Sequence, residues 1–219
     1  MGTLAILPIK SFADAKQRLA GELSAGPRRA LAEAMFSDVL VALRRAQSVD
    51  EVLVVSGDSA AQQIAGGYGA QVADDRQQGH NPAATRGIEW ALEAQIERVL
   101  LVPGDCPMLD PLQIDELCSH RPEPPSAVIV PDRHGTGTNA LLLTPPDALQ
   151  PSFGPDSCHR HAALARAAGT GYEVIDIPSL ALDIDTFEDL SELQAALADS
   201  HGGAAHTRGM LRQLMRSTT

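Results

Sequence analysis

The chain has 219 residues, 44% of them hydrophobic, and a formal net charge of −11. This length supports one sizeable core, so we expect a single domain over residues 1–199 and an unassigned tail over residues 200–219. The negative charge argues against binding to nucleic acid, and no apolar run reaches the roughly 20 residues that cross a bilayer. The chain has three cysteines, Cys106, Cys118 and Cys158, which cannot all form disulfides with one another. Together with the lack of a secretion leader, this predicts a cytoplasmic protein.

Short apolar runs and helical repeats alternate along the chain. The runs predict strands at Thr3–Ile9, Glu51–Val55, Val99–Val102, Ala127–Val130, Asn139–Leu143 and Tyr172–Ile177. Helices are expected after Pro27, over Ser59–Ala65 and Pro82–Ala94, from Asp110, over about Cys158–Ala168, and over Phe187–Leu197. This alternation predicts a single-domain, Rossmann-like α/β fold, with a mostly parallel sheet and helices on both faces. For the tail we expect a solvated extension, with a loose arm or a partner-binding helix as alternatives.

The two lysines of the chain, Lys10 and Lys16, both lie in the loop after the first predicted strand, and all other basic residues are arginines. Two flexible ammonium groups in one loop favour binding of a compact anion, above all a phosphate. Chance clustering in an arginine-biased sequence is the alternative. The loop also carries Arg18, so a negative protein begins with a locally positive segment.

Three aspartates follow predicted strands, where ligands bind in parallel sheets. Asp105 lies in Gly104-Asp-Cys-Pro107, and Asp183 and Asp185 share one side of an extended segment. A carboxylate cluster near a phosphate-binding loop favours Mg2+. The alternative for Asp185 is a helix cap, a role that we assign to Thr186. We expect Gly104 to let the backbone approach a ligand closely.

Two further glycine-containing turns are candidate ligand-binding segments. Phe153-Gly-Pro-Asp-Ser157 precedes a helix and could receive a phosphate or carboxylate, although an ordinary helix cap fits its spacing equally well. Gly135-Thr-Gly-Thr-Asn-Ala140 matches a dinucleotide-binding fingerprint, but a strand follows it instead of a helix, so we reject that interpretation. The turn could still present Thr138 to a ligand.

The remaining polar candidates are more ambiguous. Asp74, Asp75 and Asn81 could contact a base or ribose, or could simply lie in a solvated loop. His159 and His161 are two residues apart on a predicted helix and so do not share a face, which argues against a metal pair and favours surface positions for both.

Taken together, these motifs resemble the phosphoenolpyruvate and 2-phospho-L-lactate guanylyltransferases of coenzyme F-420 biosynthesis, over roughly Thr3 to Leu193. The Asp132–Thr138 turn and Phe153–Ser157 are the most specific parts. The resemblance implies a fold of the nucleotide-diphospho-sugar transferase type. It further implies an acceptor site at Thr138, Gly154 and Ser157, and Mg2+ at Asp105, Asp183 and Asp185.

The implied reaction is transfer of GMP from GTP to the acceptor phosphate, with release of pyrophosphate. Lys10, Lys16 and Asp105 would be catalytic. The nucleotide would be bound by Lys10, Lys16, Arg18 and Asn81, although Lys10 could instead reach the acceptor carboxylate. His80 and Pro82 depart from the family pattern, which leaves the base-reading role of Asn81 open.

As partners we expect the small-molecule substrates, a second copy of the chain in a homodimer, and the next transferase of the pathway, to which the product would be handed over. The alternatives are a related enzyme, such as a molybdopterin guanylyltransferase or a sugar-alcohol phosphate cytidylyltransferase, and a nucleotide-binding regulatory module without turnover.

Overall fold

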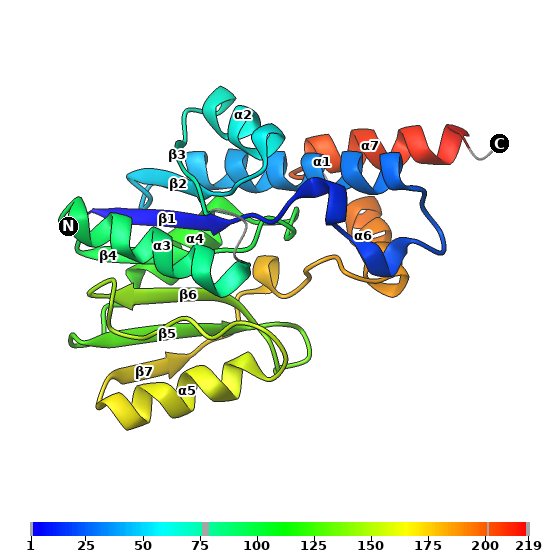
Figure 1. Ribbon diagram of the computed structural model, residues 1–219. Coiled ribbons are helices and arrows are strands. Elements are labelled where there is room, and N and C mark those ends of the chain that lie inside the picture. Colours follow the sequence, from blue (N-terminus) through cyan, green and yellow to red (C-terminus); the bar gives the residue numbers. More distant parts are fainter. Residues whose placement is uncertain (1, 76–78, 201, 218–219) are drawn as a thin grey trace.

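A computed structural model describes residues 2–75, 79–200 and 202–217 of the chain. Within these residues one seven-stranded sheet forms the centre of the molecule (Figure 1). The strand order is β3-β2-β1-β4-β6-β5-β7, and only β6 runs antiparallel to its neighbours among the described strands. The strands are β1 (Thr3–Pro8), β2 (Glu51–Val55), β3 (Gln71–Ala73), β4 (Arg98–Leu101), β5 (Ser126–Pro131), β6 (Thr138–Thr144) and β7 (Gly171–Val174).

Helices cover both faces of this sheet because the strands bury side chains alternately on the two sides. In β1, Ala5 and Leu7 pack under α1 (Ala25–Arg45), α2 (Ser59–Gly67) and α4 (Pro111–Ser119). Leu4 and Ile6 face α3 (His80–Glu93) and α5 (Ser157–Ala168). A third cluster joins α1 to α6 (Phe187–Asp199) and α7 (Ala205–Ser217) beyond the carboxyl ends of the strands (Figure 1).

The predicted mostly parallel α/β sheet is confirmed, with one addition. The edge strand β3 escaped prediction because it has three residues, none of them buried, and so shows no apolar run. Among the described residues, no helix combines the length and apolar character that crossing a membrane requires.

The expectation that the tail is a solvated extension is wrong. Helix α7 lies along α1 (Figure 1), and its Thr207 and Leu211 are buried. Asp38, itself buried on α1, accepts hydrogen bonds from the backbone N–H groups of His206 at 3.0 Å and Thr207 at 2.8 Å. A carboxylate from one helix therefore caps the start of the other, which fixes where the tail docks.

The direction of β6 matters for function. Strands β1 and β4 end at one edge of the sheet, and antiparallel β6 begins at that same edge, at Thr138. The loop after β1, the loop after β4 and the turn before β6 therefore meet at one place. The connection between β7 and α6, which includes the 3-10 helix η3 (Pro178–Leu180), brings Asp183 and Asp185 there as well.

Candidate active site

The lysine loop is folded into two 3-10 turns, η1 (Phe12–Asp14) and η2 (Gln17–Leu19), and is held by Asp58. One oxygen of Asp58 accepts from Phe12 N at 2.8 Å and Ser11 Oγ at 3.1 Å, and the other caps α2 through Ala60 N at 2.8 Å. Burial alone would raise the pKa of Asp58, but these donors outweigh it and lower the pKa. The loop is thus tied to the start of α2.

Lys16 lies between two of the predicted aspartates. Its Nζ donates to Asp105 Oδ2 at 2.5 Å and to Asp185 Oδ1 at 3.1 Å, and only 7% of its side chain is exposed. Burial alone would lower the pKa of Lys16. Attraction to Asp105 and Asp185 outweighs burial and raises the pKa above its ordinary value, so the ammonium stays charged. The backbone of Lys16 is left-handed, with φ +55°, which a lysine rarely adopts.

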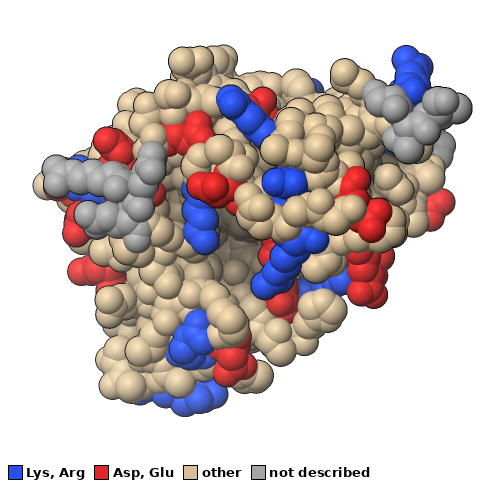
Figure 2. Space-filling view, turned by 45° about the vertical axis from the view of Figure 1, so that its right-hand side comes forward, with Lys and Arg blue, Asp and Glu red and all other residues tan. Residues whose placement is uncertain are grey.

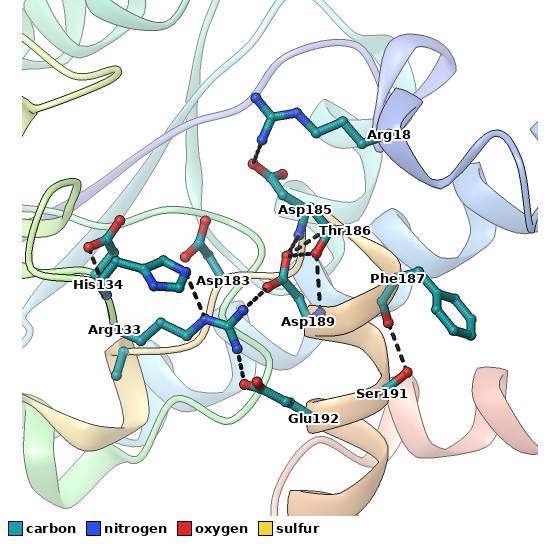
Figure 3. Close-up of polar contacts among 12 residues, drawn as sticks. Arg18, Arg133, His134, Asp183, Asp185, Thr186, Phe187, Asp189, Ser191 and Glu192 are labelled. Carbon is teal, nitrogen blue, oxygen red and sulfur yellow. Dashed lines mark hydrogen bonds and ion pairs between the residues drawn. The ribbon is translucent and has the colours of Figure 1, made fainter.

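The other cations of the loop lie nearer to solvent. Lys10 is exposed at the rim of the cavity described below. Arg18 is 74% exposed, and its Nη1 lies 3.8 Å from Asp185 Oδ2 (Figure 3). The structure therefore separates one buried, paired lysine from two accessible cations.

Asp183 is a partly buried carboxylate whose surroundings disfavour its charge. Burial raises its pKa, as does repulsion from Asp105 and Asp185, while a hydrogen bond from Asn139 Nδ2 at 3.1 Å opposes the shift. Asp183 and Asp185 point to the same side of their segment, as the sequence predicts (Figure 3). The negative charge at this point is only partly offset by Lys16.

These carboxylates fit a divalent cation that is shared with a ligand. In the described part of the chain, no three His, Cys, Asp or Glu side chains are grouped so that they could hold a metal ion by themselves, and this includes Asp105, Asp183 and Asp185. Mg2+, however, is usually held by one or two carboxylates together with water and substrate phosphates. The oxygen donors and the uncompensated charge near Asp183 suit that arrangement and not a protein-only cage.

A cavity of about 770 Å³ brings the candidate residues together, with Lys and Arg side chains around the hollow in Figure 2. Its walls include all the predicted site residues except Lys16: Lys10, Arg18, Asn81, Asp105, Thr138, Gly154, Ser157, Asp183 and Asp185. Lys16 lines an adjoining pocket with Asp105 and Asp185. The volume matches that of ordinary small-molecule sites.

The turn before β6 forms one wall of this cavity. Asp132 Oδ1 accepts from His134 N at 3.1 Å and Thr136 N at 2.9 Å, which closes the turn. A Cβ at Gly137 would lie 2.6 Å from Asp132 Oδ2, so a larger residue here would have to displace the carboxylate that closes the turn. Thr138 follows at the first position of β6, mostly buried, and lines the cavity.

The adjoining wall is the start of α5, where Cys158 N donates to Thr136 O of the turn at 3.0 Å. Asp156 is the N-cap residue, with φ +58°, but makes no capping hydrogen bond with its side chain. The alternative of an ordinary side-chain cap is therefore not what the structure shows. Gly154, with φ +123°, and Ser157 line the cavity beside this helix end. The expectation of free amides is wrong for the first two residues of α5, because Ser157 N donates to Gly154 O at 3.1 Å and Cys158 N donates to Thr136 O.

Two side chains that hold this wall were not predicted in that role. Asn81 accepts from Phe153 N at 2.7 Å and donates to Phe153 O at 3.0 Å. Arg160 donates to Ser152 O at 2.9 Å and to Pro155 O. The base-reading role of Asn81 stays a prediction, but its amide already tethers the loop to α3. Asp74 and Asp75 line a neighbouring pocket that Asn81 shares.

The prediction that both histidines lie on the surface is wrong for His161. His159 is exposed and pairs with Asp156 at 2.6 Å, whereas His161 has no exposed surface. His161 belongs to the face of α5 that carries Cys158, Ala162 and Ala165 and packs on the sheet. The i, i+2 spacing separates the two histidines but does not say which one faces inward.

The Asp132–Thr138 turn is connected by Arg133 to the segment that carries Asp183 and Asp185 (Figure 3). Arg133 donates to Asp189 Oδ1 at 2.7 Å and also pairs with Glu192. Asp189 Oδ2 accepts from the backbone N–H groups of Asp185 at 2.9 Å and Thr186 at 2.6 Å. Thr186 caps α6 as predicted, within a capping box.

Gly104 lines the pocket that holds Lys16, so its close approach to a ligand stays a prediction, and the structure adds a packing role. A Cβ at this position would lie 2.4 Å from Ile9 Cδ1 and 3.3 Å from Phe36 Cδ2. The glycine is thus required by close packing of the loop after β4 against the lysine loop and α1. It positions Asp105 indirectly, through the core.

The fold and the site together define a nucleotidyltransferase, with basic and carboxylate loops at one edge of a mostly parallel sheet. A crystal structure assigned to the nucleotide-diphospho-sugar transferases, from Desulfovibrio desulfuricans G20, has the same fold, with a TM-score of 0.76 at 17% identity. The match covers 97% of this chain and 95% of that one.

The sequence comparisons narrow the class. Residues 3–218 match the family described as "Guanylyl transferase CofC like". A phosphoenolpyruvate guanylyltransferase of Conexibacter woesei is 57% identical over 99% of this chain and 98% of its own length. A 2-phospho-L-lactate guanylyltransferase of Methanothermobacter thermautotrophicus is 34% identical over 98% and 92%. The chain belongs to this CofC-like family of guanylyltransferases.

Proposed function

We propose that the protein transfers GMP from GTP to the phosphate of phosphoenolpyruvate or 2-phospho-L-lactate, releasing pyrophosphate in coenzyme F-420 biosynthesis. The observation that carries this proposal is that one cavity is lined by Lys10, by the three predicted aspartates, and by the two walls that contain Thr138 and Ser157. The name of the relative from Conexibacter woesei favours phosphoenolpyruvate as the first acceptor to test.

In the proposed reaction an oxygen of the acceptor phosphate attacks the α-phosphorus of GTP. The bond from that phosphorus to the oxygen bridging to the β-phosphate breaks, and pyrophosphate leaves with the electron pair. A phosphate monoester is already largely dianionic near pH 7, since its second pKa is about 6, so no general base is required. His80 lines the cavity and His161 lies behind its wall, and burial lowers the pKa of both imidazoles.

The basic residues of the lysine loop have distinct proposed tasks. Lys10 and Arg18, which are accessible, would hold the triphosphate and stabilise the charge that develops on pyrophosphate. Lys16 fixes Asp105 and Asp185 relative to each other. Thr138, Gly154 and Ser157 would seat the acceptor at the start of α5.

Mg2+ is part of this proposal, and Asp105, Asp183 and Asp185 would hold it. When bound, the ion would offset phosphate charge as the new bond forms. Asn139 donates to the carboxylate of Asp183, Lys16 donates to the carboxylate of Asp185, and Asp189 holds the backbone N–H of Asp185. Cytoplasmic location, a homodimer and handover of the product stay predictions.

The test is an assay of pyrophosphate release with GTP, Mg2+ and each acceptor in turn, with the product identified by mass. Asp105→Asn should lose at least 100-fold in turnover, on the order expected for loss of a transition-state charge contact. His159→Ala, on the exposed side of α5, is the matched control. Near-normal turnover of Asp105→Asn, or equal activity with CTP, would contradict the proposal.

A further inference from the structure

A buried histidine connects the two walls of the proposed acceptor seat. The Nε2 atom of His161 lies 2.9 Å from the backbone nitrogen of Ser152, which directly precedes the Phe153–Ser157 loop. Its Nδ1 atom lies 3.0 Å from Thr138 Oγ1, at the start of β6. The ring also meets Phe153 edge to face, with centroids 5.2 Å apart.

These contacts settle which ring nitrogen carries the proton. A backbone N–H can only donate, so Nε2 must accept from Ser152 and cannot itself be protonated. The neutral imidazole then carries its hydrogen on Nδ1, which donates to Thr138 Oγ1. Burial, with repulsion from Arg160 in addition, lowers the pKa of His161 to about 4, so the ring is neutral near pH 7.

The direction of these two hydrogen bonds determines whether the Thr138 hydroxyl can donate to a ligand. Because its oxygen accepts the hydrogen from Nδ1, its own hydroxyl hydrogen is left to donate elsewhere. Thr138 lines the cavity beside Gly154 and Ser157, so an oxygen of a ligand there can receive that hydrogen. A hydroxyl that is set to donate favours an anionic oxygen over a donor group such as an alcohol or amine hydrogen.

We propose that His161 is a positioning residue for the acceptor. The hydrogen bonds from Ser152 N–H to His161 and from His161 to Thr138 orient the threonine hydroxyl as a donor toward an anionic acceptor oxygen. The inference rests on the proposed function, in which Thr138 seats the acceptor. It adds a residue that touches neither substrate. It also selects for acceptors that present a carboxylate or phosphate oxygen at this wall.

The test is a double-variant cycle read out as the KM of each substrate and kcat. Thr138→Val keeps the shape but removes the donor, and should raise the acceptor KM roughly 10- to 100-fold, as expected for a lost hydrogen bond to a charged group. His161→Leu should raise it comparably. In the Thr138→Val background, His161→Leu should add less than about 2-fold, because the two residues act in series. The KM of GTP should change by less than about 2-fold throughout.

A matched pair of amide variants separates positioning from packing. His161→Asn places its amide near the position of Nδ1 and should restore most of the acceptor affinity. His161→Gln places its amide near Nε2, contacts Ser152 instead, and should behave like His161→Leu. If His161→Leu does not fold, the Asn and Gln variants, checked by urea unfolding, carry the comparison alone.

The outcomes are distinct. Additive effects of Thr138→Val and His161→Leu, or equal acceptor KM for the Asn and Gln variants, would overturn the positioning role while leaving the proposed acceptor seat intact. An unchanged acceptor KM in Thr138→Val would instead remove Thr138 from the seat, and with it the basis of the inference.

Discussion

Replacement of Lys16 by methionine tests the charge arrangement of the site most directly. The side chain is similar in length, so the change removes the ammonium and leaves most of the packing. The buried cation between Asp105 and Asp185 would then be lost, and exposed Arg18, 3.8 Å from Asp185, would remain. We expect the variant to be less stable without Mg2+ and to respond more strongly to Mg2+ than the original protein does.

The magnitude follows from burial. Removing one partner of a fully buried ion pair costs about 3 to 5 kcal/mol, and an exposed pair contributes about 0 to 1 kcal/mol. Lys16 is 7% exposed, whereas Asp105 and Asp185 are 28% and 48% exposed, so water screens part of the loss. We therefore expect the free energy of unfolding to fall by about 2 kcal/mol, which for a chain of this size lowers Tm by about 4 to 8 °C.

The assay is thermal unfolding with EDTA and then with increasing Mg2+, in the absence of nucleotide. Mg2+ at ten times its Kd would return about 1.4 kcal/mol to the variant. Lys10→Met is the matched control, since Lys10 is exposed in the same loop and should change Tm little. Equal Mg2+ responses in the original protein and in Lys16→Met would refute the idea that Lys16 offsets the carboxylates.

Three further predictions concern packing, capping and pH. Gly104→Ala should destabilise by about 1 to 3 kcal/mol through its clash with Ile9 Cδ1, and Ile9→Val, which removes that atom, should restore most of the loss in urea unfolding. Asp38→Ala should cost about 2 kcal/mol by uncapping α7, with Asp38→Asn less affected. His161 stays neutral in the fold, with its pKa lowered to about 4, so its contribution is complete above pH 6.5 and is lost as pH falls toward 4. Between pH 7 and pH 4.5, the free energy of unfolding of the original protein should fall by about 2 kcal/mol more than that of His161→Asn.

The sheet could be predicted because its signals are local. Buried parallel strands produce apolar runs, and the helices between them repeat every three to four residues. Helix α7 was missed although Thr207, Leu211 and Leu214 have helical spacing. Its decisive contact, to Asp38, joins residues 168 and 169 positions apart, and no local pattern encodes it.

The site shows the same division. The lysines, aspartates and the two turns were identifiable from residue type and from their places after or before strands. That Lys16 binds two of the aspartates was not, since its partners lie 89 and 169 residues away. The burial of His161 left a readable signal in the stripe Cys158, Ala162 and Ala165, but its two hydrogen bonds depend on tertiary structure.

The link from Arg133 to Asp189 has a consequence for redesign of the enzyme. The turn that ends at Thr138 and the segment that carries Asp185 are joined through these two side chains, so a change of turn length would also displace a carboxylate. The loop around Gly154 is anchored by Asn81 and Arg160, and its first residue, Ser152, is joined to Thr138 of the same turn through His161. Libraries that aim at new acceptors for the proposed seat should therefore vary the exposed residues 154–156 and keep the Asp132–Thr138 turn fixed.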